Sequence, residues 1–154
     1  MYAKLQVIES LRGAAFVLCA ARLSANALIK EYEKAGGNAN AIADLQAFCE
    51  IYESALNDYG AICTAQNSVI TPLAIENFVK SEAALCKVII RILDNFGIAD
   101  FAILENEKAK LFAANGADLS GVECERLCFL SDLHAFLKAR QIADFVDLHS
   151  RAAK

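Results

Sequence analysis

The chain has 154 residues, of which 56% are apolar and 22% charged, with a single proline and a net charge of −4. This length and composition exclude a disordered chain, a collagen-like chain and a linker-rich multidomain protein, so we expect one domain spanning residues 1–154. The acidic balance argues against a general nucleic-acid binder. The apolar share exceeds that of ordinary globular chains even before glycine is counted, so we expect part of the apolar surface to face a partner.

No charge-free stretch of the sequence is long enough to predict a membrane-spanning helix. The longest charge-free stretch, Tyr59 to Ile75, has 17 residues, whereas a spanning helix needs about 20 predominantly apolar residues. The N-terminus imitates a secretory signal, with an apolar run over residues 13–21, but Glu9 and Arg22 interrupt the pattern. We therefore expect a protein without a membrane partner.

The six cysteines could form three disulfides. Four of them, Cys19, Cys49, Cys63 and Cys86, lie inside helical apolar patterns, where a free cysteine packs as a small hydrophobic residue. A chain this long and apolar does not need covalent cross-links to be stable. We therefore expect free thiols and a cytoplasmic location.

The first 35 residues predict one long helix, which Gly36-Gly37 ends. Its apolar residues recur at alternating steps of four and three, a seam with a period of 3.5 residues: Val7, Leu11, Ala14, Leu18, Ala21, Ala25, Leu28 and Tyr32. The run Ala14–Ala21 is apolar on every face. We therefore expect the middle of this helix to be covered on all sides.

A second helix is predicted from about Ala41 to Gln66, with Asn40 as its N-cap. Its seam has the same steps of three and four: Ile42, Leu45, Cys49, Tyr52, Leu56, Tyr59 and Cys63. Because only a short Gly/Asn turn separates the two helices, they are expected to form an antiparallel hairpin.

Further helices follow. Thr71-Pro72 begins a helix that runs to Phe96, and a shorter helix runs from about Asp100 to Ala114. Ser120-Gly121 begins a last helical stretch that extends to about Ala152. The segment 98–101, Ile-Ala-Asp-Phe, recurs at 142–145, and an aspartate that caps a helix in both places favours a break near Gln141. The sequence thus predicts an all-α fold, a bundle of five to six helices with a long N-terminal antiparallel hairpin.

No catalytic motif is present. The sequence has neither a glycine-rich phosphate loop nor a GxSxG elbow. Each histidine, His134 and His149, follows an Asp-Leu pair, but residues two apart on a helix point in nearly opposite directions. The remaining acidic residues of this region are interpreted as solvated: Glu105, Glu107, Glu123 and Glu125. We therefore expect a protein that is not an enzyme and that carries no cofactor.

One spacing permits a metal site. Cys124 and Cys128 are four residues apart, so on a helix their thiols share a face and could supply half of a tetrahedral site. His134 cannot easily complete it, since it lies about 9 Å further along the helix axis than Cys128. The alternative interpretation, a stripe of small residues packed against a neighbouring helix, is favoured.

Charge is distributed unevenly along the chain. No basic residue occurs between Lys34 and Lys80. The second helix carries acids alone, all off its apolar seam: Asp44, Glu50, Glu53 and Asp58. These residues are either a solvated face that complements the first helix or a docking surface for a basic partner.

The leading hypothesis is a non-catalytic helical protein, an adaptor, a regulator or a small subunit of an assembly, that binds a protein partner or forms a homo-oligomer. The alternative is a small-molecule or metal-binding bundle that uses Cys124 and Cys128. A third hypothesis is a subunit associated with nucleic acid through the basic residues of the first helix: Lys4, Arg12, Arg22, Lys30 and Lys34. It is the least favoured, because Glu9 and Glu33 lie close to that stripe.

Overall fold

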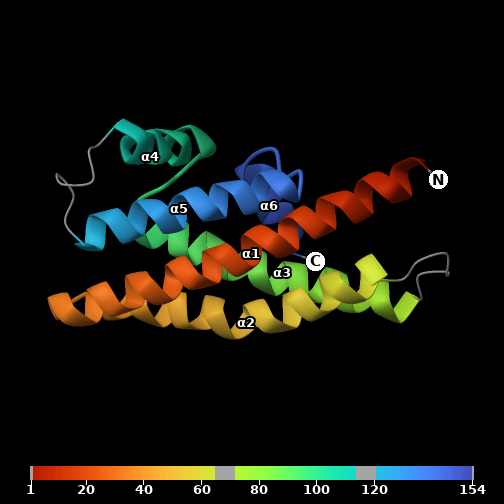
Figure 1. Cartoon of the computed structure of the whole chain (residues 1–154), viewed down its shortest axis with the longest axis horizontal. Helices are drawn as coiled ribbons and strands as arrows, with labels where there is room; N and C mark the ends of the chain where they lie inside the picture. The colour runs from red at the N-terminus through yellow and green to blue at the C-terminus, as the bar shows by residue number, and fades with distance from the viewer. Residues whose placement is uncertain (1, 65–71, 114–120, 154) are drawn as a thin grey trace.

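The structure of the chain is a computed structural model, which describes residues 2–64, 72–113 and 121–153. These residues form six helices (Figure 1). The helices are α1 (Tyr2–Ala35), α2 (Ala39–Thr64), α3 (Pro72–Asn95), α4 (Phe101–Ala113), α5 (Gly121–Ala139) and α6 (Phe145–Ala152). The described residues contain no strand. The predicted all-α bundle is therefore confirmed. The start and stop signals predicted at Gln66, Thr71, Ala114 and Ser120 lie outside the described residues.

The predicted seam of α1 is the centre of the core. Seven of its eight residues are buried, from Leu11 to Tyr32, and the side chain of Val7 lies outside those described. Three of them, Ala14, Ala21 and Ala25, are alanines with no exposed surface. Small side chains on a seam allow a neighbouring helix to approach closely.

The hairpin of α1 and α2 is confirmed, with one correction at its turn. Gly36 is left-handed (φ 73°), and the amides of Gly36 and Gly37 donate to the carbonyls of Glu33 and Tyr32, as in a Schellman motif. Helix α2 begins at Ala39 rather than Ala41. Asn38, not Asn40, caps it, because the Asn38 Oδ1 accepts a hydrogen bond from the Ala41 amide (3.2 Å).

Helix α2 packs on α3 as well as on α1. Its predicted seam is only partly buried: Leu45, Tyr59 and Cys63 are buried, whereas the other four residues are half-buried. A second row is buried beside it: Ala41, Phe48, Ala55 and Ile62. Helix α2 thus needs two apolar faces, since it lies between two neighbours.

The main neighbour of α1 is α5, which runs antiparallel to it. The Ser10 hydroxyl donates to the Ala139 carbonyl at one end, and the Ser24 hydroxyl donates to Asp132 further along. At the other end a Cβ on Gly121 would collide with the Glu31 carboxylate. Glycine at the start of α5 therefore makes room for a negative charge, which the positive end of a helix dipole favours.

The repeated Ile-Ala-Asp-Phe segments form two matching turns. Gly97 and Gln141 are left-handed (φ 73° and 58°), and each ends the preceding helix. Asp100 and Asp144 then cap α4 and α6 through hydrogen bonds from the amides three residues on (2.9 and 2.8 Å). The two motifs also touch, since their phenylalanine rings meet edge to face at 5.0 Å. The predicted break near Gln141 is confirmed, and residues 121–152 form two helices.

The predicted covering of residues 14–21 on all sides is wrong. Phe16 is 78% exposed and Leu23, beyond the run, 64%. Cys19 is exposed as well, although its thiol and the other five are free, as expected. The reason is that α2 and α5 pack on neighbouring sides of α1 and leave the side opposite the seam uncovered.

Among the described helices, one segment of α1, Ile8–Ala35, is long and apolar enough to cross a membrane by length and composition. This segment contains no long charge-free stretch, because Arg12, Arg22 and Lys30 divide it. A core helix of a soluble protein meets the same test when it is mostly buried, whereas 28% of the most apolar window of this segment is buried. The expected absence of a membrane partner stays a prediction.

The close packing of α1 is testable at Ala21. Replacing this buried alanine with leucine overpacks the seam, so the Ala21→Leu variant should lose about 1–3 kcal/mol of unfolding free energy. The exposed Glu53 on α2 is the control, and Glu53→Gln should change stability by no more than about 0.5 kcal/mol. Urea denaturation measures both. Equal losses in the two variants would contradict the placement of the seam.

Candidate functional site

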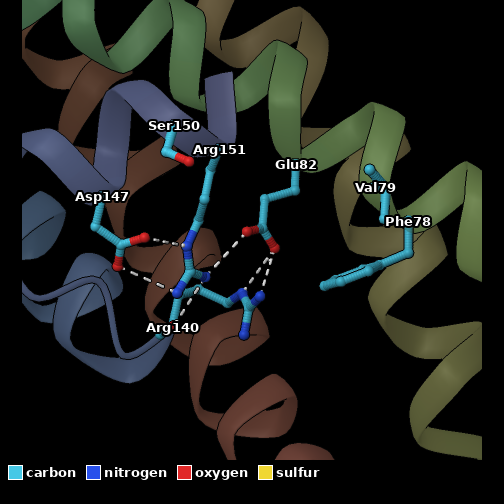
Figure 2. Close-up of a pocket in the computed structure, with 7 residues that line it drawn as sticks. All are labelled: Phe78, Val79, Glu82, Arg140, Asp147, Ser150 and Arg151. Atoms are coloured by element: carbon cyan, nitrogen blue, oxygen red, sulfur yellow. Dashed lines mark hydrogen bonds and ion pairs between the residues drawn. The ribbon is translucent and has the colours of Figure 1, made fainter. Parts of the chain in front are cut away.

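A cavity of about 320 Å³ opens between α3 and α6, and four of its seven lining residues are charged (Figure 2). Glu82 comes from α3, Arg140 from the turn after α5, and Asp147 and Arg151 from α6. Figure 2 shows the two guanidinium groups converging on the Glu82 carboxylate. The cavity thus brings together residues from three separate parts of the chain.

Each carboxylate oxygen of Glu82 has its own arginine. Arg140 donates to Oε2 through Nε and Nη2 (3.0 and 2.5 Å), and Arg151 Nη1 donates to Oε1 (3.1 Å). Arg151 also makes a two-point contact with Asp147 (3.2 and 3.3 Å). Arg140 lies over the ring of Phe78, 5.2 Å from its centroid. The two positive and two negative groups therefore neutralise one another.

Burial makes this cluster costly to disturb. The side chains of Glu82 and Arg140 are only 9% and 11% exposed. Burial lowers the pKa of Arg151, but its hydrogen bonds to Asp147 and Glu82 outweigh burial and raise that pKa above its ordinary value. Because a buried charge is tolerated only when it is paired, the cluster ties α6 to α3.

The reactive side chains close to the cluster are held in their neutral forms. Burial raises the pKa of the Cys86 thiol to about 12, and the charge of Glu82 adds to this. Burial likewise raises the pKa of Tyr59, whose ring contacts that of Phe78 (5.3 Å between centroids). The arrangement therefore favours a structural role for the cavity over acid–base or nucleophilic chemistry.

The cluster was missed in the sequence, although one signal pointed to it. Glu82 lies one turn from Phe78 and one turn from Cys86 on α3, so it occupies the buried face of an otherwise apolar pattern. A charged residue in such a place requires a partner. The partners Arg140 and Arg151 are 58 and 69 residues away, and helix periodicity carries no information on such separations.

Cys124 and Cys128, the two cysteines of the metal hypothesis, lie side by side, but they have no third ligand among the described residues. The described residues contain no group of three or more His, Cys, Asp or Glu side chains that could hold a metal ion. Burial, with the neighbouring Cys124 and Glu125, raises the pKa of Cys128 to about 11. The thiol is therefore protonated at neutral pH when no metal is bound. A metal site at Cys124 and Cys128 stays a prediction.

His134 faces α4 rather than an aspartate of its own helix. Its Nε2 lies 3.4 Å from Glu105 Oε1, and its Nδ1 lies 3.5 Å from Lys108 Nζ. Asp132, two residues before it, instead accepts a hydrogen bond from Ser24. Burial and the charge of Lys108 lower the pKa of His134, although Glu105 opposes them.

Two of the acids interpreted as solvated are engaged in ion pairs. Arg126 of α5 pairs with Glu107 of α4 (2.8 Å) and with Glu123 of its own helix (3.4 Å). Burial raises the pKa of Glu107, but Lys110 and Arg126 outweigh burial and lower it. The solvated interpretation of Glu107 is therefore wrong, because α4 folds back onto α5 and brings this carboxylate to Arg126. Glu123 pairs with a base of its own helix and stays 39% exposed.

The four acids of α2 do not form one surface. Asp44 pairs with Arg91 of α3 (3.4 Å) and accepts a hydrogen bond from Asn95. Asp58 is half-buried beside a shallow hollow that it lines with Lys80. Glu50 and Glu53 are exposed. Binding of a basic partner by Glu50 and Glu53 stays a prediction.

The basic residues of α1 are also divided. Arg22 is half-buried, with its guanidinium 5.0 Å from the centroid of the Tyr52 ring. Lys34 pairs with Glu31 (3.6 Å), and the side chain of Lys4 lies outside those described. Nucleic-acid binding by this helix stays a prediction.

The side of α1 opposite the buried seam carries a second regular stripe. On helix geometry its seven residues lie within about 80° of one another. We call it the outer stripe: Glu9, Arg12, Phe16, Cys19, Leu23, Ala27 and Lys30. Its centre is apolar and exposed, since Phe16 and Leu23 are among the few large exposed hydrophobic side chains of the described residues.

Comparisons with family models, with curated proteins and with solved structures found no match for this chain.

The buried cluster is testable by neutralising Glu82. Glu82→Gln leaves the guanidinium of Arg140 buried beside a neutral amide, so we expect a loss of about 3 kcal/mol or more in unfolding free energy. Glu76→Gln is the matched control on the same helix, because Glu76 is exposed and pairs with Lys80 in solvent. It should lose no more than about 0.5 kcal/mol. A similar small loss in both variants would show that the cluster does not hold α6 in place.

The lowered pKa of His134 predicts a pH dependence of stability. Because the folded protein binds the proton less readily than the unfolded chain, stability falls as the pH drops below the ordinary histidine value of about 6.5. His134→Gln removes this titration. Between pH 7.5 and 5.5 the melting temperature of the wild type should therefore fall by more than that of the variant. An identical loss in both proteins would contradict the assignment.

Proposed function

We propose that this chain is a non-catalytic helical protein that acts by binding a protein partner, either a different protein or a second copy of itself, through the outer stripe of α1. It would serve as an adaptor, a regulator or a small subunit of an assembly. The observation that carries the proposal is the exposed apolar centre of the outer stripe, on a helix whose opposite side is already fully used in the core.

The outer stripe has the properties of a helix-pairing surface. Phe16 and Leu23 are seven residues apart, which places them about 10 Å from each other along one side of the helix. Cys19 lies between them, and Arg12 and Lys30 lie beyond them. Removing a large apolar side chain from water contributes about 1.5–3 kcal/mol. A partner helix with a matching apolar stripe would gain this for each residue it covers.

The other features of the chain support binding rather than catalysis. The charged groups of the cavity between α3 and α6 bond to one another. The pKa values of the Cys86 thiol, near this cavity, and of the Cys128 thiol, beside Cys124, are raised. The exposed acids Glu50 and Glu53 on α2 offer a second, purely electrostatic contact. Such a contact contributes more to the association rate and specificity than to affinity.

The proposal is tested by capture with matched baits. The immobilised wild type, a Phe16→Ser/Leu23→Ser variant and a Glu50→Gln/Glu53→Gln variant are exposed to an extract of the native host. We expect the first variant to lose a protein that the wild type retains, because its apolar contact is gone. The second variant should retain that protein with a weaker dependence on salt. The same captured proteins on wild-type and Phe16→Ser/Leu23→Ser baits would overturn the proposal.

A further inference from the structure

We propose that the occupant of the outer stripe is a second copy of this chain, with two α1 helices paired antiparallel about a twofold axis that passes between Cys19 and Ala20. This inference rests on the proposed function, because it names the partner of the same surface. Its basis is that the outer stripe is complementary to itself in both shape and charge.

The spacing of the outer stripe is that of a coiled-coil seam. Its seven residues span 21 positions in six steps of three or four, an average of 3.5 residues per step. A stripe with this period stays against a partner helix along its length. The buried seam on the opposite side of α1 has the same period, so α1 has one such face for its own core and a second one whose large apolar side chains, Phe16 and Leu23, are exposed. Arg12, near one end of the second face, also interacts with the Cys63 thiol of α2.

The apolar centre of the outer stripe matches itself only in one register. When two copies run antiparallel about the stated axis, residues whose numbers add up to 39 lie opposite each other. Phe16 of one copy then meets Leu23 of the other, and Cys19 meets Ala20. Each large exposed side chain thus meets another, and the smaller residues lie near the axis.

The charges at the ends of the outer stripe favour the same register. Glu9 lies opposite Lys30 of the other copy, and the twofold axis repeats this pair at the far end. Arg12 lies opposite Ala27, so the arginines are kept apart. A parallel pairing would instead place Glu9 against Glu9, Arg12 against Arg12 and Lys30 against Lys30. Like charges directly opposite one another are unfavourable, so the charges select the antiparallel dimer.

The surroundings of α1 leave room for a second helix. The helices that pack extensively on α1 are α2 and α5, both on the side of the buried seam. Figure 1 shows the N-terminal turns of α1 standing clear of α5 and α6. An interface of this kind uses the same patch on both copies and closes after two chains, so it predicts a dimer and not a filament.

The first experiment measures mass against concentration by light scattering. The wild type should shift from the mass of one chain toward that of two as the concentration rises. Phe16→Glu places a charge against the partner's Leu23 and should abolish the shift. Val146→Glu is the matched control, because Val146 is a large exposed hydrophobic residue on α6, 80% exposed and outside the outer stripe. It should dimerise like the wild type.

A second experiment tests the register by charge reversal. Glu9→Lys and Lys30→Glu should each weaken the dimer by roughly two- to tenfold, because each replaces two surface ion pairs with like charges. The combined Glu9→Lys/Lys30→Glu protein should regain the wild-type dissociation constant. Glu33→Lys, an exposed reversal outside the outer stripe, should leave it unchanged. Failure of the combined variant to recover would overturn the antiparallel register.

Oxidative cross-linking provides a geometric test. The axis places the two Cys19 residues within one residue of the same level, within reach of a disulfide once the helices pair. Mild oxidation should therefore trap a dimer that Cys19→Ser abolishes. In the Cys19→Ser background, Phe16→Cys should not cross-link, because the two introduced thiols are seven residues apart along the axis, or about 10 Å. A parallel dimer would cross-link at Phe16→Cys.

A wild type that stays monomeric at all concentrations overturns the inference. The proposed function would survive that result if the capture experiment still retains a different protein through Phe16 and Leu23. Vesicles of phosphatidylcholine and phosphatidylserine provide the remaining control. Binding of the monomer to them, lost in Phe16→Glu, would assign the outer stripe to a lipid surface and would overturn the dimer.

Discussion

The packing of α1 on α5 is the contact on which the other elements depend. Fully buried alanines on α1 let the two helices approach closely. The large buried side chains of α5, Phe129 and Phe136, contact the rings of Phe48 and Tyr59 on α2. The antiparallel register brings Ala139 to Ser10, so the chain leaves α5 beside the middle of α3. Arg140 then meets Glu82, and the turn at Gln141 directs α6 back onto the same helix.

Local regularity made most of the helices predictable. The seam of α1, the glycine turn after it and the two aspartate caps all depend on residues within one or two turns of each other. The start of α2 was misplaced by two residues because two asparagines compete for its cap, and the hydrogen bond from the Ala41 amide to Asn38 Oδ1 decides between them. The burial of a seam was predictable, whereas the side of a helix that lacks a neighbour depends on how other helices are placed.

The two faces of α1 show that apolar composition and burial are separate properties. The run from Ala14 to Ala21 is apolar throughout, yet Phe16 and Cys19 lie in solvent while Leu18 is fully buried. The charged residues show the converse. Glu82 is charged and buried because two arginines from distant parts of the sequence reach it, and neither ion pair follows from helical spacing. The exposure of the outer stripe and the burial of Glu82 therefore follow from how the helices pack, and not from the sequence pattern of either helix.

The order of the helices along the chain has a consequence for synthesis on the ribosome. Helix α1 is made first, and α5, its principal neighbour, emerges about a hundred residues later. At typical rates of roughly 5–20 residues per second, the seam of α1 waits about 5–20 seconds for that neighbour. During this interval α2 alone covers it, and the part of the seam that α5 later buries stays in water. The nascent hairpin is therefore a stage at which the apolar seam of α1, later buried against α5, is exposed to water.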